Sequence, residues 1–297
     1  MRRMLWCGLA VLLGTRGLGA QTVPARDLWE FPLGAVLEPA ALASEPGSGL
    51  WNPAALRVPA GARWNLGVAS LTTSADQAVD GQLIALGYRR ESGVIIGVTI
   101  ARAAVPGILR TETDPQSLGD VPYNSLLASV TAARELLPHL SAGFAVRYRE
   151  GRADRLLNHA IAADLGFVLH DLPFRDARIS VSSFLWRPGR EISDRPAVLA
   201  AADLRLMGTA LRETRLGMSY NGVNRGAREY GPFVAWRIAR VDLRGAWLRT
   251  TSAGGAVTRL RSGIALHYNR FVVGVAREEG ASGLGPLYQF TLSSLIK

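Results

Sequence analysis

Most of the chain after residue 63 alternates between apolar residues and small or polar ones, with a period of two. In 161–170, Ile161 and Phe167 would share one face of a strand, whereas Asp164 and His170 would share the other. Fourteen such segments cover approximately 63–74, 78–90, 93–103, 121–134, 139–149, 158–170, 177–187, 197–207, 212–222, 228–239, 241–251, 256–268, 270–278 and 285–296. Their lengths suit tilted strands that cross a membrane, and bacterial barrels have an even strand number. We therefore predict an all-β fold, a transmembrane antiparallel β-barrel of about 14 strands over residues 63–297.

A soluble β-sandwich is the alternative, because its strands alternate in the same way. Strand number and strand length favour the barrel, and so does the pattern of connections. Longer polar connections are predicted at 104–120, 150–157, 188–196 and 223–227, and short ones at 208–211, Arg240 and Asn269. If the barrel begins in the periplasm, the longer connections fall outside the cell, as outer-membrane barrels prefer. Aromatic residues near predicted strand ends would form interfacial girdles: Tyr88, Tyr148, Trp186, Tyr220 and Tyr268.

Residues 1–20 have the pattern of a secretory signal peptide. Arg2 and Arg3 are followed by a short apolar run and then by small residues that end at Ala20. A buried N-terminal helix is the alternative interpretation. Together with the predicted barrel, this segment places the mature protein in the outer membrane of a Gram-negative-type bacterium, in contact with outer-membrane lipid.

Composition excludes several other functions. The formal net charge is +10, but three arginines lie in the predicted signal peptide, and the remaining arginines are scattered among acidic residues. We therefore expect no nucleic-acid partner. The single cysteine, Cys7, also lies in that peptide, and the four histidines show no metal-ligand spacing, so we expect no metal and no cofactor. We find no catalytic motif and expect no enzymatic activity.

Residues 21–62 lack the alternation and are predicted to form a plug segment inside the barrel. A short helix is expected at 37–43, ended by Gly47-Ser48-Gly49, and Pro53 is expected to begin another helical turn. A flexible leader is the alternative, but the small apolar residues of this region suggest packing. The candidate plug or gate residues are Gly47, Gly49, Trp51, Asn52, Pro53 and Ala54.

One predicted strand face carries many charges, which are tolerated inside a membrane only where they face water or partners. We therefore assign this face to the lumen. The candidate lumen charges are Arg147, Arg149, Asp164, His170, Asp203, Arg205, Glu213, Arg215, Arg259 and Arg261, with His267 on the same face. They would form either a basic pore lining or a salt-bridged interior that anchors the plug, and the interspersed acids favour the second.

The motif Gly49-Leu50-Trp51-Asn52-Pro53-Ala54-Ala55-Leu56 ahead of fourteen alternating segments resembles the PorV/PorQ proteins of the FadL-like outer-membrane superfamily. Further similarity lies in 140–148 and in Ala163-Asp164-Leu165-Gly166-Phe167. The resemblance implies two functions. FadL-like members admit hydrophobic solutes through a plugged barrel with a lateral opening, whereas PorV-like members receive exported proteins in type IX secretion. We expect passive transport of small or hydrophobic solutes, and keep a non-conducting secretion partner as the alternative.

Overall fold

The computed structural model describes most of the chain. The described residues are 23–30, 33–35, 38–44, 47–59, 61–74, 78–110, 119–187, 196–209, 212–222, 228–252, 255–280 and 285–297. The predicted signal peptide, residues 1–20, lies outside them, as do parts of the predicted plug segment and of the longer loops.

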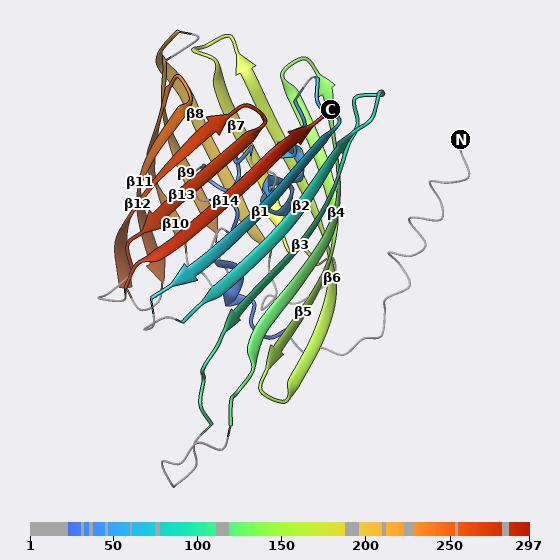
Figure 1. Ribbon diagram of the computed structural model, residues 1–297, viewed down its shortest axis with the longest axis vertical. Coiled ribbons are helices and arrows are strands. Elements are labelled where there is room, and N and C mark those ends of the chain that lie inside the picture. The colour runs from blue at the N-terminus through green and yellow to red at the C-terminus, as the bar shows by residue number, and fades with distance from the viewer. Residues whose placement is uncertain are drawn as a thin grey trace, which may run out of the picture.

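Fourteen antiparallel strands close into one barrel (Figure 1). Their bounds are β1 Trp64–Thr73, β2 Asp80–Arg89, β3 Ile95–Val105, β4 Tyr123–Leu137, β5 Leu140–Ala153, β6 Leu156–Leu172, β7 Ala177–Phe184, β8 Ala197–Thr209, β9 Arg212–Gly222, β10 Arg228–Ile238, β11 Val241–Ser252, β12 Gly255–Tyr268, β13 Phe271–Glu278 and β14 Leu287–Ile296. Each strand pairs with its sequence neighbours, and β1 closes the ring against β14 from Trp64↔Ile296 to Thr73↔Leu287. The predicted barrel and its strand number are confirmed.

One predicted connection is wrong. Residues 150–157 were expected to form a long polar loop, but β5 continues to Ala153 and β6 begins at Leu156. Gly151 is buried in this region whereas Arg152 is exposed, so the alternation persists. The segment resembled a loop because hydrophilic residues increase toward the strand ends, where a strand leaves the apolar layer.

The connections divide the barrel into two ends. At the short-turn end, β4 and β5 are joined through Pro138 and His139, and β12 and β13 through Asn269 and Arg270. At the loop end, residues 106–122 join β3 to β4. Short turns are periplasmic in bacterial outer-membrane barrels, so the short-turn end corresponds to the predicted periplasmic side.

The outer face of the barrel is apolar. Ile84 and Ile100 are adjacent partners in the ladder between β2 and β3, and their side chains are 60% and 53% exposed. Aromatic residues lie toward both strand ends: Trp64, Trp236 and Tyr268 at the short-turn end, and Tyr148, Tyr220 and Tyr288 at the loop end. An exposed apolar band with aromatic borders is the lipid-facing surface of a membrane barrel.

The part ahead of the barrel contains three short helical elements: η1 (Asp27–Glu30), α2 (Ser48–Trp51) and η2 (Pro53–Ala55). The predicted helix at 37–43 is wrong in its described part, where residues 39–43 form only turns. A helix begins instead at Ser48, within the stretch expected to break one, and all four of its residues are buried. Tertiary packing overrides weak local propensity here.

Pro53 begins η2 as predicted, at a position where the missing N–H of proline costs nothing. Of the helices described, none has the length and apolar character needed to span a membrane.

Candidate functional site

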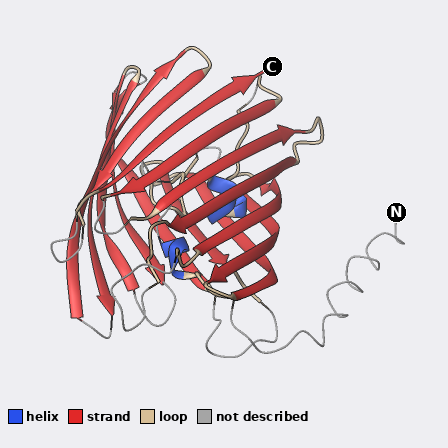
Figure 2. Cartoon of the chain, turned by 60° about the horizontal axis from the view of Figure 1, so that its bottom comes forward, coloured by secondary structure: helices blue, strands red, loops and turns tan. Residues whose placement is uncertain are grey.

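The N-terminal segment, the described part of residues 23–59, lies inside the ring of strands (Figure 2). Trp29 Nε1 donates to Ser125 Oγ on β4 at 2.9 Å, and the Gly34 amide donates to Gln289 Oε1 on β14 at 3.0 Å. The Val23 carbonyl accepts from Arg149 on β5 at 3.3 Å. The segment is therefore bonded to strands on several sides of the lumen.

Asn52 is the most connected residue of this segment. Its side-chain amide donates to the Ala41 carbonyl and to Ser180 Oγ on β7, both at 2.8 Å, while its Oδ1 accepts from the Ala54 amide at 3.0 Å. The side chain is fully buried. Asn52 thus caps η2, ties two parts of the segment together and joins both to the wall.

Trp51, beside Asn52, is also enclosed. Its Nε1 donates to the Leu33 carbonyl at 2.8 Å, and its ring lies 4.7 Å from that of Phe184 at the end of β7. Ser182 Oγ donates to the Trp51 carbonyl at 3.0 Å. The candidate gate residues of the sequence, Gly47, Gly49, Trp51, Asn52, Pro53 and Ala54, are all buried within the barrel.

A row of inward-facing glycines on the wall receives this motif. The row consists of Gly87 on β2, Gly97 on β3, Gly143 on β5 and Gly166 on β6. A Cβ added to Gly143 would lie 2.3 Å from the Pro53 carbonyl carbon, and one added to Gly166 would lie 2.0 Å from Asn52 Oδ1. The glycine socket, as we call these four residues, lets the segment approach the wall backbone directly.

Arg147 and Asp164 form an ion pair between β5 and β6, and both side chains are completely buried. Arg147 also donates to the Gly49 carbonyl at 3.3 Å and lies over the Phe184 ring at 5.3 Å. Asp164 Oδ1 accepts from the Trp186 amide at 2.9 Å. The pair therefore joins the segment, two paired strands and the chain that follows β7.

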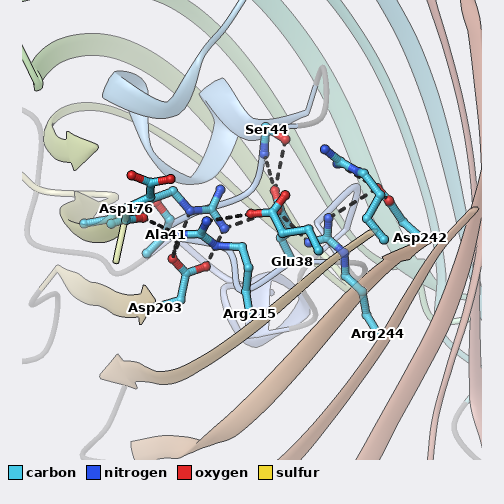
Figure 3. A network of polar contacts seen from close by, with 12 residues as sticks. Glu38, Ala41, Ser44, Asp176, Asp203, Arg215, Asp242 and Arg244 are labelled. Carbon is cyan, nitrogen blue, oxygen red and sulfur yellow. Dashed lines mark hydrogen bonds and ion pairs between the residues drawn. The ribbon is translucent and has the colours of Figure 1, made fainter. Parts of the chain in front are cut away.

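Glu38 is the hub of a larger polar network (Figure 3). Its carboxylate lies 2.6 Å from Arg244 on β11 and 3.6 Å from Arg178 on β7, and it accepts from the amide and hydroxyl of Ser44. Arg178 also pairs with Asp203 on β8. A buried carboxylate of the N-terminal segment thus bridges β7 and β11, which are four strands apart in the wall.

The candidate charges on β9 belong to this same network. Arg215 reaches Asp203 and Glu213 at 2.8 Å each, and Arg244 lies 3.7 Å from Asp242 on β11. Asp242 also accepts from Arg237 at 2.8 Å. The carboxylates and guanidinium groups are interleaved, which leaves little net charge at the centre of the lumen.

Arg259 and Arg261 form a separate cluster toward the loop end. Both guanidinium groups lie 2.5 Å from Glu278 on β13, and both also pair with Glu229 on β10. Arg205 pairs with Asp176. Arg205 lies toward the short-turn end and is joined to the Glu38 network, because the Asp176 carbonyl accepts from Arg215 at 2.6 Å, whereas His170 lies at the short-turn rim.

One seam of the barrel is shorter than the others. Within the described residues, the ladder between β6 and β7 is confined to Gly166–Leu172 of β6, although β6 begins at Leu156. After β7, Leu185 adopts a left-handed conformation (φ 58°), and Phe184 and Leu185 are both buried. The regular ladder therefore stops at Ser182 of β7, and beyond it the Ala163 amide donates to the Trp186 carbonyl at 2.8 Å, which joins the chain after β7 to β6.

A cavity of about 310 Å³ lies between the N-terminal segment and the wall, toward the short-turn end. Its apolar lining includes Leu83 and Val272, and its polar lining includes Glu38, Arg244 and His267. This size is at the lower end of small-molecule sites. An amphipathic cavity therefore lies next to the anchored segment.

Several residues of the site were missed from the sequence. Glu38 lies in the stretch predicted to be a helix, 37–43, and no neighbouring residue in the sequence indicates that its carboxylate contacts the barrel wall. A signal did exist for Asp242, Glu229 and Glu278, since each is an acid at an inward position of a predicted strand. The same alternation that singled out the arginines would have found their partners.

Comparison with known proteins gives a structural but not a sequence match. No protein-family model matches the chain, and no curated protein matches it. Its structure is similar to the toluene transporter TbuX of Ralstonia pickettii, with a TM-score of 0.58 and 11% identity over 89% of this chain and 98% of that one. It is also similar to the monoaromatic hydrocarbon channel CymD, with a TM-score of 0.61 and 11% identity over 89% and 97%.

These likenesses extend over nearly the whole of both known proteins. They show that this chain shares a closed β-barrel fold with those two proteins.

Proposed function

We propose that the protein is an outer-membrane channel for passive transport of small hydrophobic solutes, with the N-terminal segment as its plug. The observation that carries this proposal is the 310 Å³ cavity enclosed jointly by the segment and the wall. As a plug, the N-terminal segment would be the movable boundary of this cavity. Such a cavity can hold a single small molecule and can also open. TbuX is a toluene transporter and CymD a monoaromatic hydrocarbon channel, so toluene and related monoaromatic hydrocarbons are the first solutes to test.

The seam between β6 and β7 supports a lateral route for such solutes. Beyond the Gly166–Ser182 pair the regular ladder between β6 and β7 gives way to irregular bonds, among them the Ala163 amide to the Trp186 carbonyl, so fewer hydrogen bonds close this seam than a full ladder would supply. A hydrophobic solute that leaves sideways enters lipid and does not need to cross the charged centre of the lumen. This route fits the balanced ion pairs, which suit a closed interior better than a basic pore.

A disulfide lock tests the proposal. A Cβ built on Gly34 lies 3.7 Å from the Cβ of Ala69 on β1, a separation that a disulfide accepts, although φ of 75° at Gly34 strains any side chain there and the Gly34→Cys single variant measures that strain. The double variant Gly34→Cys/Ala69→Cys would therefore pin the segment to the wall when oxidised. We expect uptake of toluene into proteoliposomes to fall on oxidation and to return on reduction.

The matched controls are the two single-cysteine variants, whose transport should not respond to oxidant. Glucose uptake would measure leakage through damaged barrels. Toluene uptake no faster than that of protein-free liposomes, from verified folded protein, would rule the proposal out.

The dense packing of the segment favours a second candidate, a non-conducting partner in protein secretion of the PorV type. Asn52, Trp51 and Glu38 are all buried and bonded to other parts of the molecule. A barrel that never opens would show no flux with or without reductant. Recovery of exported proteins that share a C-terminal domain in a pull-down would then support this candidate.

A further inference from the structure

His139, His170 and Asp171 converge at the short-turn rim, outside the lumen networks. His139 lies in the turn between β4 and β5, and the other two residues lie near the end of β6. One potential ligand atom from each residue falls within 4.8 Å of the other two. The two histidines are 31 positions apart in the sequence, so no spacing rule could have paired them.

Strand pairing holds this cluster in place. The His170 amide donates to the His139 carbonyl at 2.9 Å, which fixes the turn against β6. His139 has φ 74° and Asp171 has φ 51°, so both side chains project from left-handed positions next to a regular ladder. The backbone of the site is therefore set by the barrel and does not depend on a ligand.

The hydrogen bonds of His170 suit a metal ligand. Its Nδ1 lies 2.9 Å from Asp171 Oδ2, and its Nε2 lies 3.3 Å from Ser141 Oγ. Metal-bound imidazoles commonly give their second N–H to such a partner, which fixes the ring orientation. With Nε2–H donated to Ser141, the lone pair of Nδ1 faces the carboxylate, and a cation between them would replace a shared proton.

We propose that His139, His170 and Asp171 form a binding site for a divalent transition-metal ion of the zinc class. Two imidazoles and one carboxylate are typical ligands for such ions, and water would complete the coordination. Ligands around one zinc ion lie roughly 3.4 Å apart at tetrahedral angles, so the wider separations in the cluster must shrink while the 2.9 Å between His170 Nδ1 and Asp171 Oδ2 must widen slightly. His139 is exposed and can supply that movement through its side-chain rotamers.

The site also has an electrostatic link to the N-terminal segment. Arg57 interacts through charge with Asp171 and with Glu135 of β4. A metal cation beside Asp171 would be repelled by the positive charge of Arg57. Neutralising Arg57 should therefore strengthen metal binding, an effect that a purely structural cluster would not produce.

The test is calorimetric titration of untagged, refolded full-length mature protein with zinc chloride, supported by the visible absorption of bound Co²⁺. We expect one ion per barrel. His170→Gln and His139→Asn should each weaken binding by about tenfold or more, and Ser141→Ala by less. Asparagine at position 139 tolerates the left-handed backbone, so the turn is preserved. Arg57→Gln should tighten binding severalfold.

His159→Gln is the matched control, because His159 is an exposed histidine at the opposite end of the same strand, β6. Its affinity should equal that of the unaltered protein. Heat-modifiable gel mobility would verify that each variant folds. No heat signal at about 1 mM zinc, or a folded His139→Asn/His170→Gln double variant that binds as well as the control, would overturn the proposal.

Discussion

The Glu38 carboxylate lies 2.6 Å from the Arg244 guanidinium, so a residue that precedes every strand is bonded to β11. Glu38 is 5% exposed, and a second arginine, Arg178, approaches it from β7. Charges buried to this degree stabilise a structure only while they remain paired. This relationship makes Glu38 the residue whose loss should most directly free the N-terminal segment.

Glu38→Gln should release the segment while leaving the barrel closed. The variant removes the negative charge that Arg178 and Arg244 share, and loss of one partner of a buried pair costs about 3–5 kcal/mol. We expect more frequent channel openings in planar bilayers. Glu91→Gln is the control, since the Arg63–Glu91 pair is exposed and weak. Equal conductance in both variants would contradict the anchoring role of Glu38.

Filling the glycine socket with a side chain should displace the segment from the wall. In Gly143→Ala the new methyl group would lie 2.3 Å from the Pro53 carbonyl carbon, so the backbone of η2 must move, at a cost of about 1–3 kcal/mol. We expect faster proteolysis of the segment with the barrel intact. Gly245→Ala on β11 should change nothing, because its nearest neighbour, Val234 Cγ1, is 3.8 Å away.

The Arg147–Asp164 pair should show strong coupling in a double-mutant cycle. Asp164→Asn leaves a buried guanidinium without its counter-charge, and we expect a loss of about 3–5 kcal/mol in the free energy of unfolding. Arg147→Met/Asp164→Asn should be less destabilised than the sum of the single variants, by at least about 0.5 kcal/mol. Reversible urea unfolding in liposomes would measure this, and simple additivity would show that the pair contributes no coupling.

A charged substitution on the outer face should destabilise the barrel more strongly the closer it lies to the middle of the bilayer. Ile84 is 60% exposed near the middle of β2, and Ile84→Arg should destabilise the barrel in lipid by about 2–4 kcal/mol. Gln82→Arg, on the same face but nearer the strand end, should cost about 0–1 kcal/mol. Identical costs at the two positions, measured by unfolding from liposomes, would mean that this face does not contact the bilayer core.

Much of the barrel was predictable because the alternating sequence of each strand shows which side chains face the lumen and which face outward. The inward position of Asp164 and the outward position of Phe167 follow from the period of two, without knowledge of any partner strand. Strand ends were less predictable where both faces become polar, as at Arg152 in β5. There the alternation of hydrophobicity fades although the alternation of the backbone continues.

The N-terminal segment was less predictable because its conformation depends on distant contacts. The motif at 49–56 was recognised, but the reason for its residues is visible only in the fold. The Asn52 side chain donates a hydrogen bond to Ser180, and Pro53 packs against the backbone of Gly143, where any side chain would clash. Small inward residues of the strands, such as Gly143 and Gly166, leave space along the wall, and the segment occupies part of that space.

The position of the segment restricts the order in which the molecule is assembled. Gly34 is bonded to β14 and Asn52 to β7, while the connection from the segment into β1 follows directly. If β1 paired with β14 while the lumen was still empty, the N-terminal segment would later have to enter the lumen through one end of the closed barrel. We therefore expect the segment to be in place before β1 pairs with β14, so that the barrel closes around the segment in the last step of folding.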